Sequence, residues 1–253
     1  MTPPGGAADG SARKLIAVIL ACAAGVALVA IVVYGALHKA DSGIAKVTIG
    51  ARDEVYYSHA ATEADAATLG RALQGTGFFS DRGAAVLLSK GKGGSIVSFV
   101  LNEGAWDHAG TVSTFEEIGR RIAGPAGGFP IRLRLCDAKW NTHKELTIGK
   151  VMEGTRDEIY YYGAATESEA QALGDALKRA GYLVDSGSSV ILAKDRTTSI
   201  SFVVSDVAWQ RLSSVVDFEL LIRKVAPAVG GTPIDLRLLN ANMEVKREVP
   251  GLQ

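Results

Sequence analysis

The stretch Arg52-Asp53-Glu54-Val55-Tyr56-Tyr57 occurs again as Arg156-Asp157-Glu158-Ile159-Tyr160-Tyr161, an offset of 104 residues. Each copy is followed by Ala-Ala-Thr-Glu, which ends at Glu63 and at Glu167. Similarity of this kind at a fixed spacing indicates a duplicated structural unit. Most of the chain is therefore predicted to be one fold written twice, with repeat 1 at residues 46–145 and repeat 2 at residues 146–249.

The same order of strand and helix signals follows the repeated stretch in both copies. In repeat 1, β-branched and aromatic runs predict strands at residues 46–50, 55–57, 85–89, 96–101 and 131–135. One helix is predicted to begin at the N-cap Thr62, and a second contains Phe115. The order β-α-β-β-α-β in about 100 residues is typical of a ferredoxin-like unit. We therefore predict an α+β protein with two tandem ferredoxin-like (βαββαβ) repeats, each with a four-stranded antiparallel sheet.

The N-terminal 37 residues differ in composition from the repeats. Residues 1–14 are rich in Gly, Pro and Ala, which predicts a disordered tail. Residues 15–37 carry no charge, and a helix of this length spans about 34 Å, enough to cross a hydrocarbon core of about 30 Å. A buried helix, a cleaved signal peptide or a lipidated Cys22 are the alternatives. We predict an uncleaved transmembrane helix over residues 15–37.

This prediction carries an expected location. Two basic residues, Arg13 and Lys14, precede the apolar segment. The positive-inside bias then favours a cytoplasmic N-terminus and extracytoplasmic repeats. The sequence thus predicts a single-pass membrane protein.

Composition argues against several classes of partner and cofactor. Lys+Arg and Asp+Glu both number 27, and neither repeat concentrates positive charge, so nucleic acid is not an expected partner. The two cysteines, Cys22 and Cys136, and the four histidines show no metal-ligand spacing. No metal site and no cofactor site are predicted.

The repeated Arg-Asp-Glu triplet is the most obvious candidate for catalysis. Adjacent strand residues point to opposite faces, so Asp53 and Glu54 are poorly placed to share a proton or a metal. Trp106 and Trp209 are interpreted as core anchors rather than recognition residues. No nucleophile with an orienting partner accompanies a histidine. We therefore predict no catalytic residues and a protein that is not an enzyme.

The sheet face opposite the helices is the predicted binding surface. Its candidate residues are Tyr56, Arg134, Tyr160, Tyr162 and Arg237. The short connection between the repeats predicts that these faces, or the adjoining sheet edges, meet as a pseudo-symmetric pair. The function expected from this arrangement is protein binding or assembly, including self-association. The alternatives are a small-ligand sensory or regulatory module with its site at the inter-repeat cleft and, less favoured, an enzyme.

Overall fold

The computed structural model of the chain describes residues 43–253, which divide into a first unit ending at Leu146 and a second unit, Thr147–Gln253. The predicted tail, residues 1–14, and the predicted transmembrane segment, residues 15–37, lie outside the described residues. Each unit is built on the repeated stretch, which forms the start of a strand in both.

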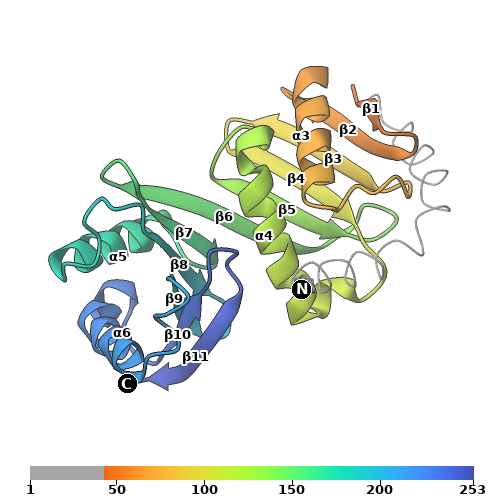
Figure 1. The fold of residues 1–253 in the computed structure, drawn as a ribbon. Helices are drawn as coiled ribbons and strands as arrows, with labels where there is room; N and C mark the ends of the chain where they lie inside the picture. The colour runs from red at the N-terminus through yellow and green to blue at the C-terminus, as the bar shows by residue number, and fades with distance from the viewer. Residues whose placement is uncertain (1–42) are drawn as a thin grey trace, which may run out of the picture. The chain divides into compact units, whose positions relative to one another are not determined.

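The first unit alternates hairpins with helical connections (Figure 1). Its elements in chain order are β1 Ala45–Ile49, β2 Asp53–His59, α3 Glu63–Gly75, β3 Ala85–Gly91, β4 Gly94–Val100, the short 3-10 helix η2 Ala105–Asp107, α4 Ala109–Ala126, β5 Ile131–Cys136 and β6 Thr142–Glu153. The last strand, β6, continues past Leu146 into the second unit.

The second unit repeats this order. After β6 its elements are β7 Asp157–Gly163, α5 Glu167–Arg179, β8 Ser189–Lys194, β9 Thr198–Val203, α6 Leu212–Val225, the 3-10 helix η3 Ala226–Val229, β10 Ile234–Leu239 and β11 Val245–Leu252. The helices α5 and α6 are therefore the counterparts of α3 and α4.

The prediction of two ferredoxin-like repeats with four-stranded antiparallel sheets was wrong. The eleven described strands follow one another in the order of the chain, in one mixed sheet. A ferredoxin-like unit separates the two strands that a helix connects. Here α3 connects the adjacent parallel strands β2 and β3, and α4 connects β4 and β5. Antiparallel hairpins, such as β1–β2 and β3–β4, alternate with these crossovers.

The order of elements could not reveal this difference. Both arrangements read β-α-β-β-α-β along the chain, and helical connections of similar length can return the chain to the neighbouring position or to the next one. Parallel strands need a crossover, which α3 and α4 supply, whereas a short turn is sufficient for an antiparallel neighbour. Strand order therefore had to come from the structure.

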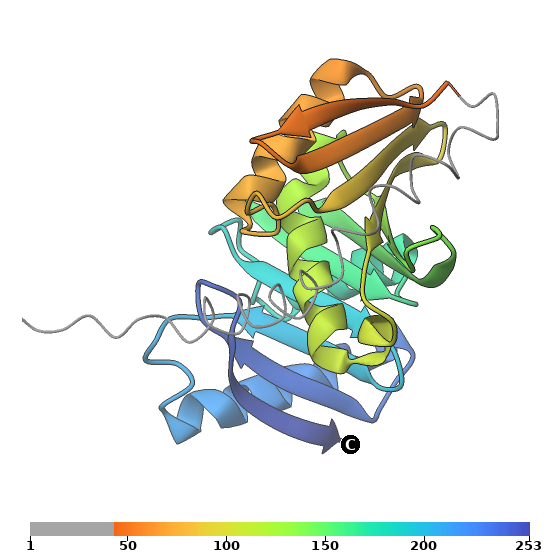
Figure 2. The same ribbon diagram turned by 90° about the vertical axis from the view of Figure 1, so that its right-hand side faces the viewer.

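The helices of each unit cover one face of its strands. In the first unit α3 and α4 lie side by side over that face, as Figures 1 and 2 show. An aromatic contact beneath them joins α4 to the sheet, with the ring centres of Phe99 and Phe115 4.9 Å apart. In the second unit Phe202 and Phe218 repeat this contact at 4.9 Å. Burial of an aromatic ring of this size contributes about 1.5–3 kcal/mol, so this layer is a main source of stability.

The predicted location is also corrected. Within residues 43–253 no helix combines the length and the apolar character that crossing a membrane requires. The segment on which the single-pass prediction depends, residues 15–37, lies outside the described part of the chain.

Candidate functional site

The aspartate of the repeated stretch holds a loop closed. Asp53, at the start of β2, is 1% exposed, and its carboxylate accepts hydrogen bonds from the backbone N–H groups of Asp81, Gly83 and Ala84 at 2.7–2.8 Å. The Asp81 carboxylate in return accepts from the two backbone N–H groups that precede Asp53, at 2.7 and 2.8 Å. The two aspartates thus join the entry of β2 to the loop before β3.

The second unit repeats this latch. Asp157 is fully buried and accepts from the N–H groups of Asp185, Gly187 and Ser188 at 2.7–2.8 Å. Burial opposes ionisation of Asp157, but these three donors outweigh it and lower the pKa of the carboxyl group. At 0% exposure, the Asp157 carboxylate is closed to solvent and therefore to a substrate. The first acidic residue of the repeated stretch is therefore a structural latch.

Glu54, the glutamate of the repeated stretch, contacts side chains instead of backbone groups. Glu54 accepts a hydrogen bond from the Tyr56 hydroxyl at 2.7 Å and forms an ion pair with Lys46 of β1 at 2.5 Å. The Lys46 Nζ also lies 6.0 Å from the centre of the Tyr56 ring. Burial, followed by the hydrogen bond and the charge of Glu54, raises the pKa of Tyr56. This Lys-Glu-Tyr cluster ties β1 to β2.

An equivalent cluster joins β6 to β7. Tyr160 donates to Glu158 at 2.8 Å, and Lys150 lies 3.3 Å from the Glu158 carboxylate and 5.9 Å from the Tyr160 ring centre. Tyr162, two residues along β7, is 6% exposed and lies opposite Ile148 of β6. The three tyrosines predicted to form a binding face are therefore buried, and they contact residues of their own strand and of the strand beside it.

The two predicted arginines form matching cross-strand ion pairs. Arg134 of β5 donates through Nε to Glu145 at 2.8 Å, and Arg237 of β10 donates through Nε to Glu248 at 2.8 Å. These pairs occupy equivalent positions in the two units. The structure thus engages Tyr56, Tyr160 and both arginines in internal contacts. Their predicted role as an inter-repeat binding face stays a prediction.

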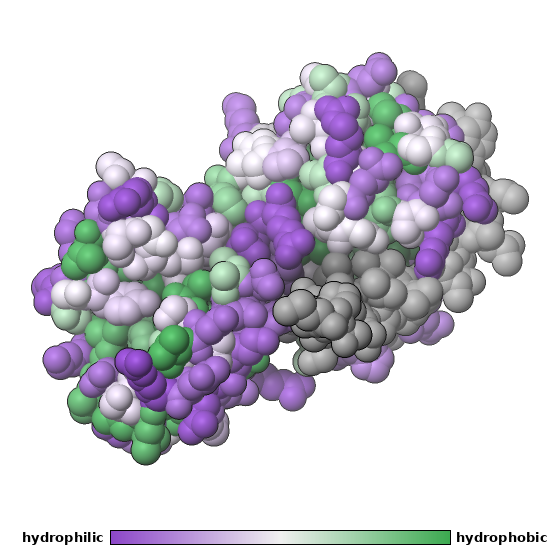
Figure 3. Space-filling view, in the orientation of Figure 1, coloured by the Kyte–Doolittle hydropathy of each residue, from purple (hydrophilic) through white to green (hydrophobic). Residues whose placement is uncertain are grey.

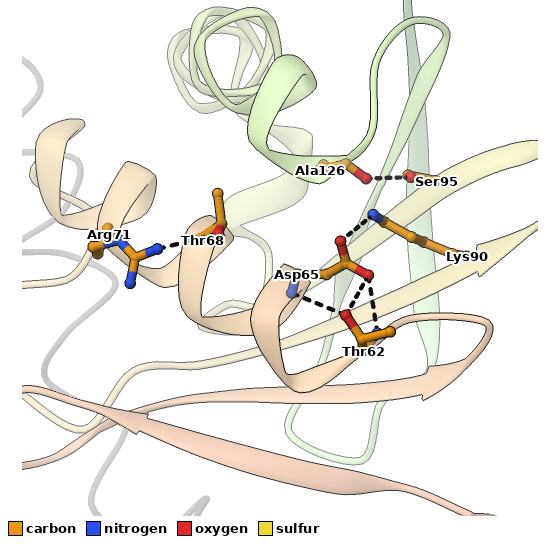
Figure 4. Close-up of polar contacts among 7 residues, drawn as sticks. All are labelled: Thr62, Asp65, Thr68, Arg71, Lys90, Ser95 and Ala126. Atoms are coloured by element: carbon orange, nitrogen blue, oxygen red, sulfur yellow. Dashed lines mark hydrogen bonds and ion pairs between the residues drawn. The ribbon is translucent and has the colours of Figure 1, made fainter.

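A second duplicated cluster lies at the N-terminus of the first helix of each unit, and Figure 4 shows the copy in the first unit. Thr62 and Asp65 form a reciprocal capping box, in which each side chain accepts a hydrogen bond from the other residue's backbone N–H. Lys90 of β3 places its Nζ 2.7 Å from the Asp65 carboxylate. The hydrogen bond from Lys90, reinforced by those from Thr62, lowers the pKa of Asp65 to about 2. In the second unit Glu169 and Lys194 form the corresponding pair at 2.5 Å.

Gly127, which follows α4, leaves room for the Lys90 side chain. A Cβ atom on Gly127, which has φ +119°, would lie 3.2 Å from both the Lys90 Nζ and the Ser95 Oγ. Ser95 donates to the carbonyl of Ala126 at 2.5 Å, which is also visible in Figure 4. The cluster thus joins the start of α3, the end of β3 and the end of α4. Each charged or polar group of the cluster has a partner within it, so the cluster, here called the clamp, holds these segments together.

Substitution of Asp65 tests this clamp through its pH dependence. The folded-state pKa of Asp65 lies below the unfolded value, so the carboxylate stabilises the fold above about pH 4, and this contribution is lost as the pH falls towards 2. We expect Asp65→Asn to cost about 1 kcal/mol at pH 7 and little near pH 2. Urea unfolding at both pH values measures the difference. Asp175→Asn, at an exposed position of α5, is the control and should cost about the same at both.

Trp106, one of the two aromatic corner residues, is buried against a histidine. Its ring stacks on His143 with centres 3.9 Å apart and an interplanar angle of 7°. His143 Nε2 lies 3.3 Å from the Asp137 carboxylate. Burial raises the pKa of Asp137, but hydrogen bonds from Asn141, His143 and a backbone N–H outweigh this effect and lower it to about 2. Across residues 43–253, no group of three or more acidic, histidine or cysteine side chains could hold a metal ion.

The exposed face of α6 is a feature that sequence reasoning missed. Leu212, Val216 and Leu220, here called the α6 stripe, are 72%, 43% and 48% exposed. Their spacing of four residues places them in one row along the helix. Figure 3 shows hydrophobic residues breaking the hydrophilic surface in the area where Figure 1 places α6. The opposite side of α6 is the buried one and includes Val215 and Ile222.

The matching face of α4 is not apolar. With an offset of 103 residues, the counterparts of the α6 stripe are Ala109, Ser113 and Glu117. Glu117 forms an ion pair with Arg121, four residues further along α4, at 2.5 Å. The same side of the helix is thus suited to solvent in the first unit and exposes leucine and valine in the second. A helix with two apolar sides, rather than one, is the sequence signal that could have revealed this face.

Charged residues of α6 lie beside the stripe or beyond its end. Asp217, Glu219 and Lys224 form no ion pair with any other residue in the described part of the chain. Arg223 donates through Nε to the backbone carbonyl of Gln253 at 3.2 Å. The α6 surface therefore combines an apolar row with acidic groups near its middle and basic groups near its C-terminal end.

Comparison with known proteins adds no relative to this description. No protein-family model matches the chain, and no curated protein or solved structure shows significant similarity to it.

Proposed function

We propose that the protein acts by binding another protein chain, as an assembly module, and that the exposed side of α6 is its contact surface. The observation that carries this proposal is the α6 stripe of Leu212, Val216 and Leu220, which has no apolar counterpart on α4. The two units share their element order and their internal polar contacts. A row of exposed apolar residues on α6, where the counterpart helix α4 has small and charged residues, therefore indicates a demand placed on that face rather than on the fold.

Burial of this face by a bound partner would be favourable in free energy. Complete burial of one leucine or valine contributes about 1.5–3 kcal/mol relative to exposure. Covering the partly exposed α6 stripe would recover part of that amount at each of three positions. Apolar residues in a continuous row, rimmed by charged groups, are typical of protein interaction surfaces. Flanking charges such as Asp217 and Lys224 would add selectivity for a partner of matching charge.

The duplicated polar motifs are engaged in contacts within the fold. The carboxylates of Asp53 and Asp157 are each filled by three backbone donors, and Glu54 and Glu158 are each held by a lysine and a tyrosine. Such groups stabilise strands and loops. The alternative of a small-ligand sensory module at the inter-repeat cleft stays a hypothesis, and no contact among the described residues favours it.

A photo-activated cross-linking amino acid at position 216 tests the proposed binding surface. In cells that produce the full chain, we expect a discrete cross-linked species that the wild-type chain does not give. The matched control carries the same amino acid at position 113, the counterpart on α4, and should give no such species. Equal cross-linking at the two positions, or none at either, would contradict the proposed function.

A further inference from the structure

We propose that the occupant of the α6 stripe is a second copy of this chain, bound through an antiparallel pairing of α6 with its counterpart about a twofold axis near Leu220. This inference rests on the proposed binding function and specifies its partner. The spacing of the apolar residues and the order of charges along α6 both point to this partner.

The apolar and small residues of α6 and η3 match each other in this pairing. An antiparallel arrangement centred on Leu220 sets each position opposite the one equally distant on the other side. Leu220 then meets Leu220 of the second copy, and Leu212 meets the exposed Pro227 and the half-buried Ala228 beyond the end of α6. Val216 faces the aliphatic stem of Lys224, a contact that long basic side chains commonly make. Rows of residues four apart can interdigitate when two helices cross.

The charges are complementary in the same register. Asp217 lies three positions before Leu220, and Lys224 lies four positions after it, on the same flank of the helix. Antiparallel pairing about a twofold axis therefore brings Asp217 of each copy beside Lys224 of the other. Glu219 and Arg223 are related in a similar way on the apolar row's other side. The twofold axis repeats each of these contacts with the two copies exchanged, so each ion pair occurs twice in the dimer.

The unpaired state of these groups favours this partner over others. Among residues 43–253, neither Asp217 nor Lys224 has an ion pair to give up on association. A partner with its own unrelated sequence would need an acidic and a basic residue at the same spacing, whereas a second copy supplies both. The helix is 14 residues long, about 21 Å. A single helix pair of that length falls below the size of a stable interface, about 1,200 Å², so the expected dimer is weak and concentration-dependent.

Charge exchange on the full chain tests the pairing. Sedimentation equilibrium is measured for the wild type, Asp217→Lys, Lys224→Asp and the double variant that carries both. Each single variant places like charges together at both contacts, so we expect its dimer dissociation constant to rise about tenfold. The double variant restores opposite charges, and its dissociation constant should return to within about twofold of the wild-type value. Ser113→Lys on α4 is the matched control and should leave association unchanged.

The outcomes separate this inference from the proposed function. A double variant as weak as the single variants would overturn the pairing, as would a wild-type chain that is monomeric at every concentration reached. If the cross-linked species obtained from position 216 has the mass of the chain plus a different protein, the second copy is overturned while the binding function stands. A species with twice the mass of the chain supports both. Circular dichroism of each variant shows that folding is retained.

Discussion

Replacement of Asp157 by alanine is expected to destabilise the second unit by about 3 kcal/mol. The carboxylate accepts three backbone hydrogen bonds in a fully buried position, and its removal leaves the N–H groups of Asp185, Gly187 and Ser188 without their acceptor. Each such donor loses solvation that the folded chain cannot replace. Urea unfolding at pH 7, followed by a probe in the second unit, measures the loss.

The effect has a matched control and a pH signature. Asp175→Ala, at an exposed position, should change the unfolding free energy by no more than about 0.5 kcal/mol. Because the pKa of Asp157 is lowered in the folded state, its contribution is complete above about pH 4 and is lost as the pH falls further. The wild type and Asp157→Ala should therefore converge in stability at low pH. A loss as small as that of the control would show that the latch has no energetic role.

Replacement of Gly149 by alanine is expected to cost about 2–3 kcal/mol. Gly149 of β6 pairs with Tyr161 of β7, and the Tyr161 ring lies over the glycine. A Cβ atom at position 149 would overlap that ring. Tyr161 is 5% exposed, so the ring can give way only by leaving a packed position. An added methyl group therefore forces a displacement rather than filling a void. Thermal unfolding of the variant is the measurement.

The first unit supplies the comparison for this variant. Ala45 stands at the position equivalent to Gly149, opposite Tyr57, which is less deeply buried than Tyr161. Ala45→Gly should therefore change stability by less than about 1 kcal/mol. In a Tyr161→Leu background, Gly149→Ala should cost much less than in the wild type, because the overlapping ring is gone. Equal costs in both backgrounds would refute the overlap as the cause.

Local signals predicted the elements of the fold better than their arrangement. The helix N-cap Thr62 was predicted from the sequence and is confirmed, and its counterpart Thr166 has the same reciprocal capping box. Capping depends on residues within one turn, so the sequence contains the whole interaction. The neighbours of β2 and β4 were predicted wrongly because strand order depends on packing between segments far apart along the chain. Periodicity reports which side of a strand is buried but not which strand lies beside it.

The candidate site shows the same division. Tyr56 and Tyr160, which belong to the repeated stretch, were predicted as binding-face residues. The structure places them in equivalent contacts with Glu54 and Glu158. Repetition marked a structural requirement common to both units. The α6 stripe escaped notice because it is a difference between the units, and its leucines resemble core residues when the burial of each side of a helix is unknown. Exposure had to be observed before Leu212 and Leu220 could be interpreted.

The strand β6 has a consequence for how the chain would bear load. Its first half corresponds to β11, as the equivalent Arg134–Glu145 and Arg237–Glu248 pairs show, and its second half corresponds to β1, because Gly149 opposite Tyr161 repeats Ala45 opposite Tyr57. The end of one repeat and the start of the next are thus merged into one extended segment, Thr142–Glu153. Tension applied along the chain would pass from one repeat to the other through a strand that is already extended, with no slack to take up first. Resistance to stretching would then be set by the hydrogen-bonded ladders on β6 rather than by a linker.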